Sequence, residues 1–138
     1  MRGIDALPGP HFVIFPGVGD FRKLRAWQES VLLVEVSRDA ILKLPHHERF
    51  LLADQWRRAV YSVSLNIAEG ASRRGAKEFR RYLDMARGSL HEIEAILALV
   101  ETQGYLTAAE LSHVAERRDN CAKMVYGLLQ KMSKRASS

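Results

Sequence analysis

The sequence contains a single cysteine among 138 residues, and this scarcity excludes several protein classes. Cys121 cannot form an internal disulfide, and no cysteine pair is present that could hold zinc. No apolar run approaches the roughly 20 residues needed to cross a bilayer. The N-terminus lacks the basic stretch and apolar segment of a secretory signal. We therefore expect a cytoplasmic chain with no membrane partner, in which Cys121 is a small core residue.

Proline is nearly absent after the first 19 residues. Three of the four prolines, Pro8, Pro10 and Pro16, fall within that segment together with several glycines, and no amphipathic period is visible there. We expect residues 1–19 to form an irregular N-terminal arm, residues 20–133 one folded domain, and residues 134–138 a short basic tail. A chain of this length can bury a substantial core without metals or disulfides.

Sequence patterns typical of β-strands are also missing. After residue 19, apolar residues recur at the period of an α-helix. Asp20 is placed to cap a first helix over 21–44, which Pro45 would end. A second helix is predicted over 48–69, with Gly70 as its left-handed C-cap.

The third predicted helix, over 76–103, has the most regular apolar pattern, with alternating steps of four and three residues. Gly88 and Ser89 lie in its middle, where a close approach of another helix would explain the glycine. Thr107 and Glu110 form the capping box of a fourth helix. Four helices with short links predict an all-α fold, an antiparallel up-down-up-down four-helix bundle.

A mostly uncharged polar stripe runs along the second helix beside its apolar face. Its members are Gln55, Arg58, Ser62, Asn66 and Glu69. A solvated stripe would be rich in lysine and glutamate, so this one indicates a polar seam inside a bundle or between subunits. Folding the second helix against the third predicts a buried or half-buried ion pair between Arg58 and Glu92; the alternative is an arginine that extends to water. Glu69 is placed to pair with Arg73 or Arg80.

The net charge of +5 permits an anionic partner, and the positive charge is concentrated in two groups. The first surrounds the link between the second and third helices: Arg73, Arg74, Lys77, Arg80 and Arg81. The second, near the C-terminus, is Lys131, Lys134 and Arg135. Because a helix N-terminus favours phosphate, the first group predicts binding of RNA or DNA backbone without base readout. The alternative is a solubilising basic rim.

Catalytic motifs are not visible in the sequence. A di-iron bundle needs two Glu-x-x-His motifs, and only one is present, Glu110 to His113. No nucleophile with a base, glycine-rich phosphate loop or zinc spacing occurs. We therefore expect no enzyme activity, no metal and no cofactor.

Two motifs on the second and third helices occur together at a specific spacing. They are Asn-Ile-Ala-Glu-Gly at 66–70 and Gly-Ser-Leu at 88–90, with Arg73-Arg74 and Glu78-Phe79 between them. In these residues the chain resembles the four-helix-bundle proteins encoded in intervening sequences of bacterial 23S rRNA genes, also called S23 ribosomal proteins. That family usually has a proline where this chain has Ser64, so we expect a straighter second helix here.

The resemblance implies a left-handed bundle that assembles into a ring, commonly a homopentamer, with no catalytic chemistry. Tyr61, Leu65 and Ala68 independently form a second apolar strip on the second helix, away from its core face. Related bundles serve as accessory factors beside reverse transcriptases. The alternative function is therefore a structural or protein-interaction bundle with no role in nucleic-acid binding.

Overall fold

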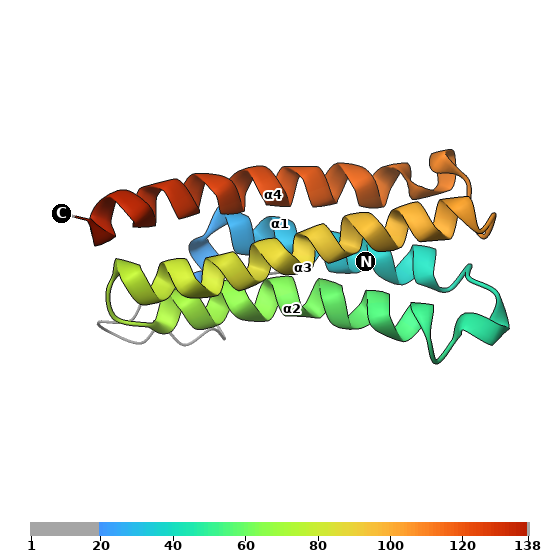
Figure 1. Cartoon of the computed structure of the whole chain (residues 1–138), viewed down its shortest axis with the longest axis horizontal. Helices are drawn as coiled ribbons and strands as arrows, with labels where there is room; N and C mark the ends of the chain where they lie inside the picture. The colour runs from blue at the N-terminus through green and yellow to red at the C-terminus, as the bar shows by residue number, and fades with distance from the viewer. Residues whose placement is uncertain (1–19, 138) are drawn as a thin grey trace.

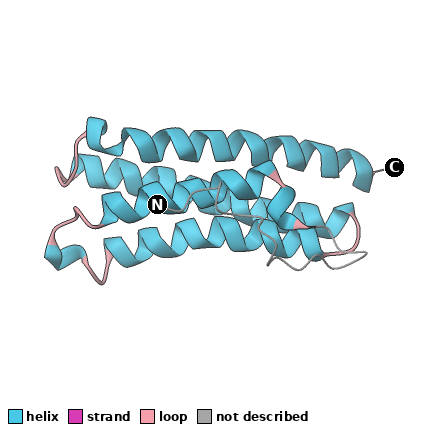
Figure 2. Cartoon of the chain, turned by 180° about the vertical axis from the view of Figure 1, so that it is seen from behind, coloured by secondary structure: helices cyan, strands magenta, loops and turns pink. Residues whose placement is uncertain are grey.

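All regular structure in the described part of the chain is helical. The computed structural model describes residues 20–137, so the predicted arm at 1–19 lies outside the described residues. Four long helices lie side by side with their loops at the two ends of the bundle (Figures 1 and 2). They are α1 (Arg25–Ile41), α2 (Leu52–Ser72), α3 (Ala76–Thr102) and α4 (Ala108–Ala136). The predicted all-helical four-helix fold is confirmed.

The apolar stripes of the four helices meet in one core. Each helix contributes side chains that are 0 or 1% exposed, among them Leu33, Trp56, Ile93 and Val114. The main packing contacts join α1 to α2, α2 to α3, α3 to α4 and α4 to α1. No helix within residues 20–137 is both long and apolar enough to cross a membrane.

Several helix ends lie where the sequence signals predicted them, but α1 and α2 begin later than expected, at Arg25 and Leu52. Asp20 caps the short 3-10 helix η2 (Phe21–Lys23) rather than α1, and a second 3-10 turn, η3 (His46–Glu48), precedes α2. The capping box of α4 is present: the Glu110 amide donates to Thr107 Oγ1 at 3.1 Å, and the Thr107 amide donates to Glu110 Oε1 at 3.0 Å. The hydrogen bond from the Thr107 amide to the Glu110 carboxylate lowers the pKa of Glu110. Because α4 continues to Ala136, most of the predicted tail is helical.

The two predictions about helix glycines are wrong. Gly70 does not cap α2, which continues to Ser72, and Gly75 instead takes the positive φ of 84° in the turn. Gly70 is buried, and a Cβ there would lie 2.8 Å from Phe79 Cδ1 and 2.9 Å from Tyr82 Cβ. Gly88, by contrast, has nothing within 4 Å of its Cβ position. The close approach of α2 and α3 therefore occurs at Gly70, beside the turn.

Cys121 lies in the core, as its position on the apolar face of α4 predicted. Its side chain is 0% exposed, and Sγ lies 3.7 Å from the Ala26 carbonyl oxygen. Burial disfavours the thiolate and raises the pKa of this thiol from 9.0 to about 12.

This pKa shift predicts a loss of stability at alkaline pH. Between pH 9 and about 12 the thiol ionises in the unfolded chain but stays protonated in the folded one. The unfolded state then binds fewer protons, so the free energy of unfolding falls with rising pH, by up to about 1.4 kcal/mol per pH unit. Urea unfolding across this window should show a steeper decline for the wild type than for Cys121→Ala. Parallel declines would show that the thiol ionises equally in both states.

Candidate nucleic-acid interface

Polar side chains on α2 and α3 form hydrogen bonds at two places along the stripe of the second helix. Ser89 Oγ donates to Ser62 Oγ at 2.8 Å. Asn66 Nδ2 donates to the Ser62 carbonyl oxygen at 2.9 Å and to its hydroxyl at 3.0 Å. Further along the helices, the Gln55 side-chain amide donates to the Glu92 carboxylate. The two bonds that cross between the helices, from Ser89 to Ser62 and from Gln55 to Glu92, set the register of α2 against α3.

The predicted ion pair between Arg58 and Glu92 is wrong. Arg58 Nε instead lies 3.1 Å from Asp54 Oδ2, one turn earlier on the same helix, and the arginine side chain is 76% exposed. Glu92 accepts its hydrogen bond from Gln55. A pair this exposed contributes little to stability, and Arg58 lies outside the seam.

Two arginines, one in the turn after α2 and one on α3, lie against the same tyrosine of α3. Arg73 Nη2 donates to the Tyr82 hydroxyl at 2.8 Å, and its guanidinium lies 5.0 Å from the centre of the ring. The Arg81 guanidinium lies 4.6 Å from the centre of the same ring. Such cation–π contacts orient an arginine without neutralising its charge. The contact between Tyr82 and Arg73 could not be predicted from the sequence, because it depends on how the chain reverses at Gly75.

Two carboxylates partly neutralise these same arginines. Arg73 Nη2 lies 2.9 Å from Glu69 Oε2, which confirms one of the two predicted partners of Glu69. Arg81 Nε lies 3.3 Å from Glu78 Oε2, and this hydrogen bond with the carboxylate raises the pKa of Arg81. Both pairs are exposed, so they hold the side chains in place more than they stabilise the fold.

The other three predicted cations have no such partners. Arg74, Lys77 and Arg80 are exposed and form no ion pair within the described part of the chain. Arg74 lies in the turn, whereas Lys77 and Arg80 lie in the first two turns of α3. Their charges are therefore available to an external anion.

The fold brings the two basic groups of the sequence to the same end of the bundle. Figure 1 shows the C-terminal end of α4 beside the turn between α2 and α3. A groove of about 440 Å³ runs between α3 and the end of α4, and Lys77, Arg80 and Arg81 line it together with Ser133 and Ser137. Its carboxylates are Glu78, which already binds Arg81, and Asp84. Lys131, Lys134 and Arg135 lie on the last turns of α4, at this end. We refer to Arg74, Lys77, Arg80 and the end of α4 as the basic end.

The second apolar strip on α2 is largely open to solvent. Leu65 is 67% exposed and Tyr61 48%, whereas Ala68 is half-buried. A leucine this exposed on a regular helix contributes little to the core of one chain.

Metal-binding clusters are not found between residues 20 and 137: no three histidine, cysteine or carboxylate side chains gather there. Glu110, the acidic residue of the single Glu-x-x-His motif, is bound in the capping box of α4.

The family model described as 23S rRNA-intervening sequence protein matches residues 22–127, which include all of α1, α2 and α3 and most of α4. No curated protein matches the chain.

Proposed function

The chain belongs to the 23S rRNA-intervening sequence protein family, and from this premise we propose that it is a non-enzymatic, cytoplasmic bundle that binds RNA backbone through its basic end. The observation that carries the proposal is the set of three exposed cations without ion pairs, Arg74, Lys77 and Arg80. Lysine and arginine side chains that neutralise phosphates release counterions, and this release supplies most of the free energy of sequence-independent binding.

The start of α3 supports an anionic ligand at this place. Gly75 precedes the helix, and no side chain caps it, so the first backbone amides have no side-chain acceptor. The positive end of the helix dipole adds to the charge of Lys77 and Arg80. Phosphate groups would meet backbone amides and cations together.

Sequence-specific recognition is not part of the proposal. The helices of the basic end are packed into the bundle, and neither is presented as a free recognition helix. Binding should therefore tolerate any RNA sequence and weaken steeply with salt. DNA of the same length is expected to bind through the same cations. Titration of labelled RNA with the wild type and with variants of the three cations tests the proposal.

The finer architecture is also proposed here. Contacts between α2 and α3 pair residue 55 with 92, 62 with 89, and 73 with 82, so the numbers rise on one helix as they fall on the other. This supports the antiparallel up-down-up-down arrangement. A left-handed twist of the bundle is proposed from the family resemblance alone.

We further propose that the chain assembles through the α2 strip into a homo-oligomer, a homopentamer by family resemblance. Leu65 and Tyr61 are the exposed apolar residues that support this interface. A charge at Leu65 would be buried without a partner in the assembly, so Leu65→Glu should raise the concentration at half-assembly by at least about tenfold. Sedimentation equilibrium at micromolar concentration measures this. Arg87→Glu, an exposed site on α3, is the control, and a wild type that sediments as a monomer would contradict the proposal.

A further inference from the structure

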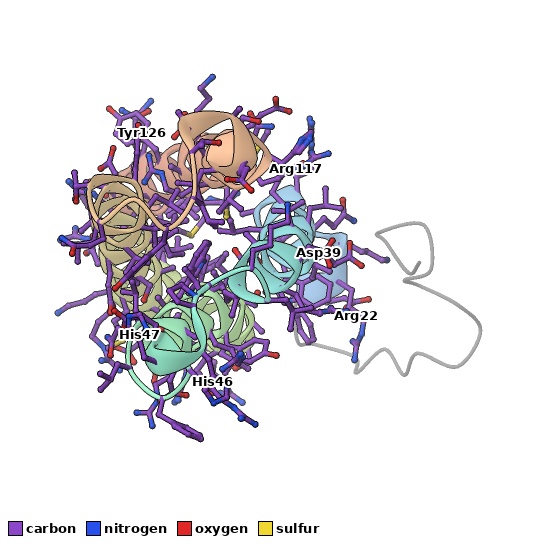
Figure 3. The ribbon with its side chains drawn as sticks, turned by 90° about the vertical axis from the view of Figure 1, so that its right-hand side faces the viewer. Arg22, Asp39, His46, His47, Arg117 and Tyr126 are labelled. Atoms are coloured by element: carbon purple, nitrogen blue, oxygen red, sulfur yellow. The ribbon has the colours of Figure 1, made fainter. Side chains whose placement is uncertain are left out.

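The end of the bundle away from the basic end carries exposed apolar side chains on the connection between α1 and α2. Leu42 is 77% exposed and Phe50 is 79% exposed, the two highest values among the large apolar residues of the described chain. Figure 3 views this end directly and shows His46 and His47 on the same connection. Large apolar side chains that project from a connection contribute nothing to the core, so a contact outside the chain would explain them.

A cavity of about 340 Å³ lies beside these residues. Leu42, Leu44 and the buried Ile41 and Ala53 provide apolar walls, and Arg49 and Arg57 also line the cavity. His46 and Pro45 complete the lining, and no carboxylate takes part in it. We call this cavity, together with the adjacent Phe50, the loop pocket.

Both arginines of the loop pocket remain available to a ligand. Arg57 is exposed on α2 and forms no ion pair within residues 20–137. The Arg49 guanidinium lies 5.2 Å from the centre of the Phe50 ring, a contact that orients the side chain and leaves its charge uncompensated. The pocket therefore combines two positive charges with an apolar interior.

Hydrogen bonds hold the connection in place. Tyr105, on the link between α3 and α4, donates from its hydroxyl to Glu48 Oε2 at 2.7 Å, and His47 Nε2 lies 3.2 Å from the same hydroxyl. The hydrogen bond to the Glu48 carboxylate raises the pKa of Tyr105. The two loops at this end are thus tied together, so a ligand would find the pocket largely formed, which lowers the entropic cost of binding.

We propose that the loop pocket binds an acidic amphipathic segment of a partner protein. Guanidinium groups pair with carboxylates in a planar, bidentate geometry that ammonium groups cannot provide, and both cations of the pocket are arginines. The aliphatic walls at Leu42 and Leu44 suit a leucine or an aromatic side chain of the same segment. A helix or turn with carboxylates three or four residues from such a side chain meets both requirements.

The aliphatic lining favours a protein segment over RNA. Phosphate contacts need cations alone, and bases stack on aromatic rings or guanidinium planes, so RNA would leave the leucines of the pocket exposed. The proposal is independent of RNA binding at the basic end, because the two surfaces share no residue.

Selection from a display library of random 12-residue peptides tests the proposal on the full chain. Peptides enriched on the wild type should combine aspartate or glutamate with leucine, phenylalanine or tryptophan within four positions. Their affinity, measured by fluorescence polarisation, should fall at least tenfold on Arg49→Glu/Arg57→Glu and at least threefold on Leu42→Ser. Leu42 is so exposed that this second variant should fold normally, which circular dichroism can verify.

Two matched variants serve as controls. Arg87→Glu/Lys123→Glu makes the same charge change at exposed sites on α3 and α4, and Leu99→Ser makes the same leucine-to-serine change at an exposed site on α3. Neither variant should change peptide affinity twofold. Failure to enrich acidic, apolar peptides, or equal binding to the double variant, would overturn the proposal. A loss of RNA affinity or of self-association in the Arg49→Glu/Arg57→Glu variant would overturn it in favour of RNA or a second copy of the chain.

Discussion

Replacing Arg74, Lys77 and Arg80 together with alanine is expected to weaken RNA binding by about 100-fold at low salt. Each cation that neutralises a phosphate contributes roughly 0.7 to 0.9 to the slope of log affinity against log salt. Removing three should make the slope shallower by about 2 and remove most of the counterion-release free energy. Arg73 and Arg81 should matter less individually, because Glu69 and Glu78 already pair with them.

Polarisation of a labelled RNA at two salt concentrations measures this effect. The matched control is Arg38→Ala/Arg87→Ala/Lys123→Ala, which removes the same charge from exposed sites on α1, α3 and α4. If the control loses as much affinity as the test variant, net charge rather than the basic end governs binding. If neither variant changes the affinity, the three cations form a solubilising rim.

Gly70→Ala is expected to destabilise the fold by about 2 kcal/mol. The added Cβ would lie 2.9 Å from Tyr82 Cβ, an atom fixed by the backbone of α3, and 2.8 Å from the Phe79 ring. The two helices must separate locally, and overpacking of this kind costs about 1 to 3 kcal/mol. Because the contact is this short, we take the upper part of that range. The helix propensity of alanine recovers at most about 1 kcal/mol of it, which leaves a net loss of about 2 kcal/mol.

Gly88→Ala provides the internal comparison. A Cβ at Gly88 meets nothing within 4 Å, so only the propensity of alanine acts, and stability should rise by about 0.5 to 1 kcal/mol. Urea unfolding of both variants measures the two signs in one experiment. A Gly70→Ala protein as stable as Gly88→Ala would show that α2 and α3 do not pack closely at the turn.

Helix positions could be predicted from the sequence because apolar residues recur at the helical period and local capping groups end the pattern. Thr107 and Glu110 form a capping box that depends only on residues three positions apart, so it could be predicted without knowing the packing of the bundle. The polar stripe on α2 also indicated that this side of the helix meets another helix. Ser62 and Asn66 are too polar for a core and too uncharged for a fully solvated face, and in the structure Ser62 accepts a hydrogen bond from Ser89 on α3 while Asn66 donates to Ser62 on its own helix.

The contacts of individual residues could not be predicted with the same success, because each residue has several alternative positions or partners of similar energy. Gly70 and Gly75 are both suitable for the end of a helix, and only the contact with Phe79 and Tyr82 assigns Gly70 to the helix interior. Arg58 pairs with Asp54 on its own helix rather than with Glu92 on α3, and both groups of this pair stay hydrated.

Some features that combine distant parts of the chain could be found only in the folded structure. The predicted up-down-up-down arrangement implies that the fourth helix ends at the same end of the bundle as the turn between α2 and α3, and Figure 1 shows it there. Only the structure reveals the groove that Lys77, Arg80 and Arg81 line between α3 and the end of α4. Phe50 was overlooked because a predicted helix over 48–69 placed it inside regular structure, whereas it lies before α2 and is 79% exposed.

The salt dependence of RNA affinity tests backbone binding most directly. We predict that the wild type binds two RNAs of equal length and unrelated sequence with the same affinity. For both, log affinity should fall linearly with log salt, with a slope of about −2 or steeper. An affinity that is insensitive to salt, that differs tenfold between the two sequences, or that is absent at low salt would contradict the proposed role of the basic end.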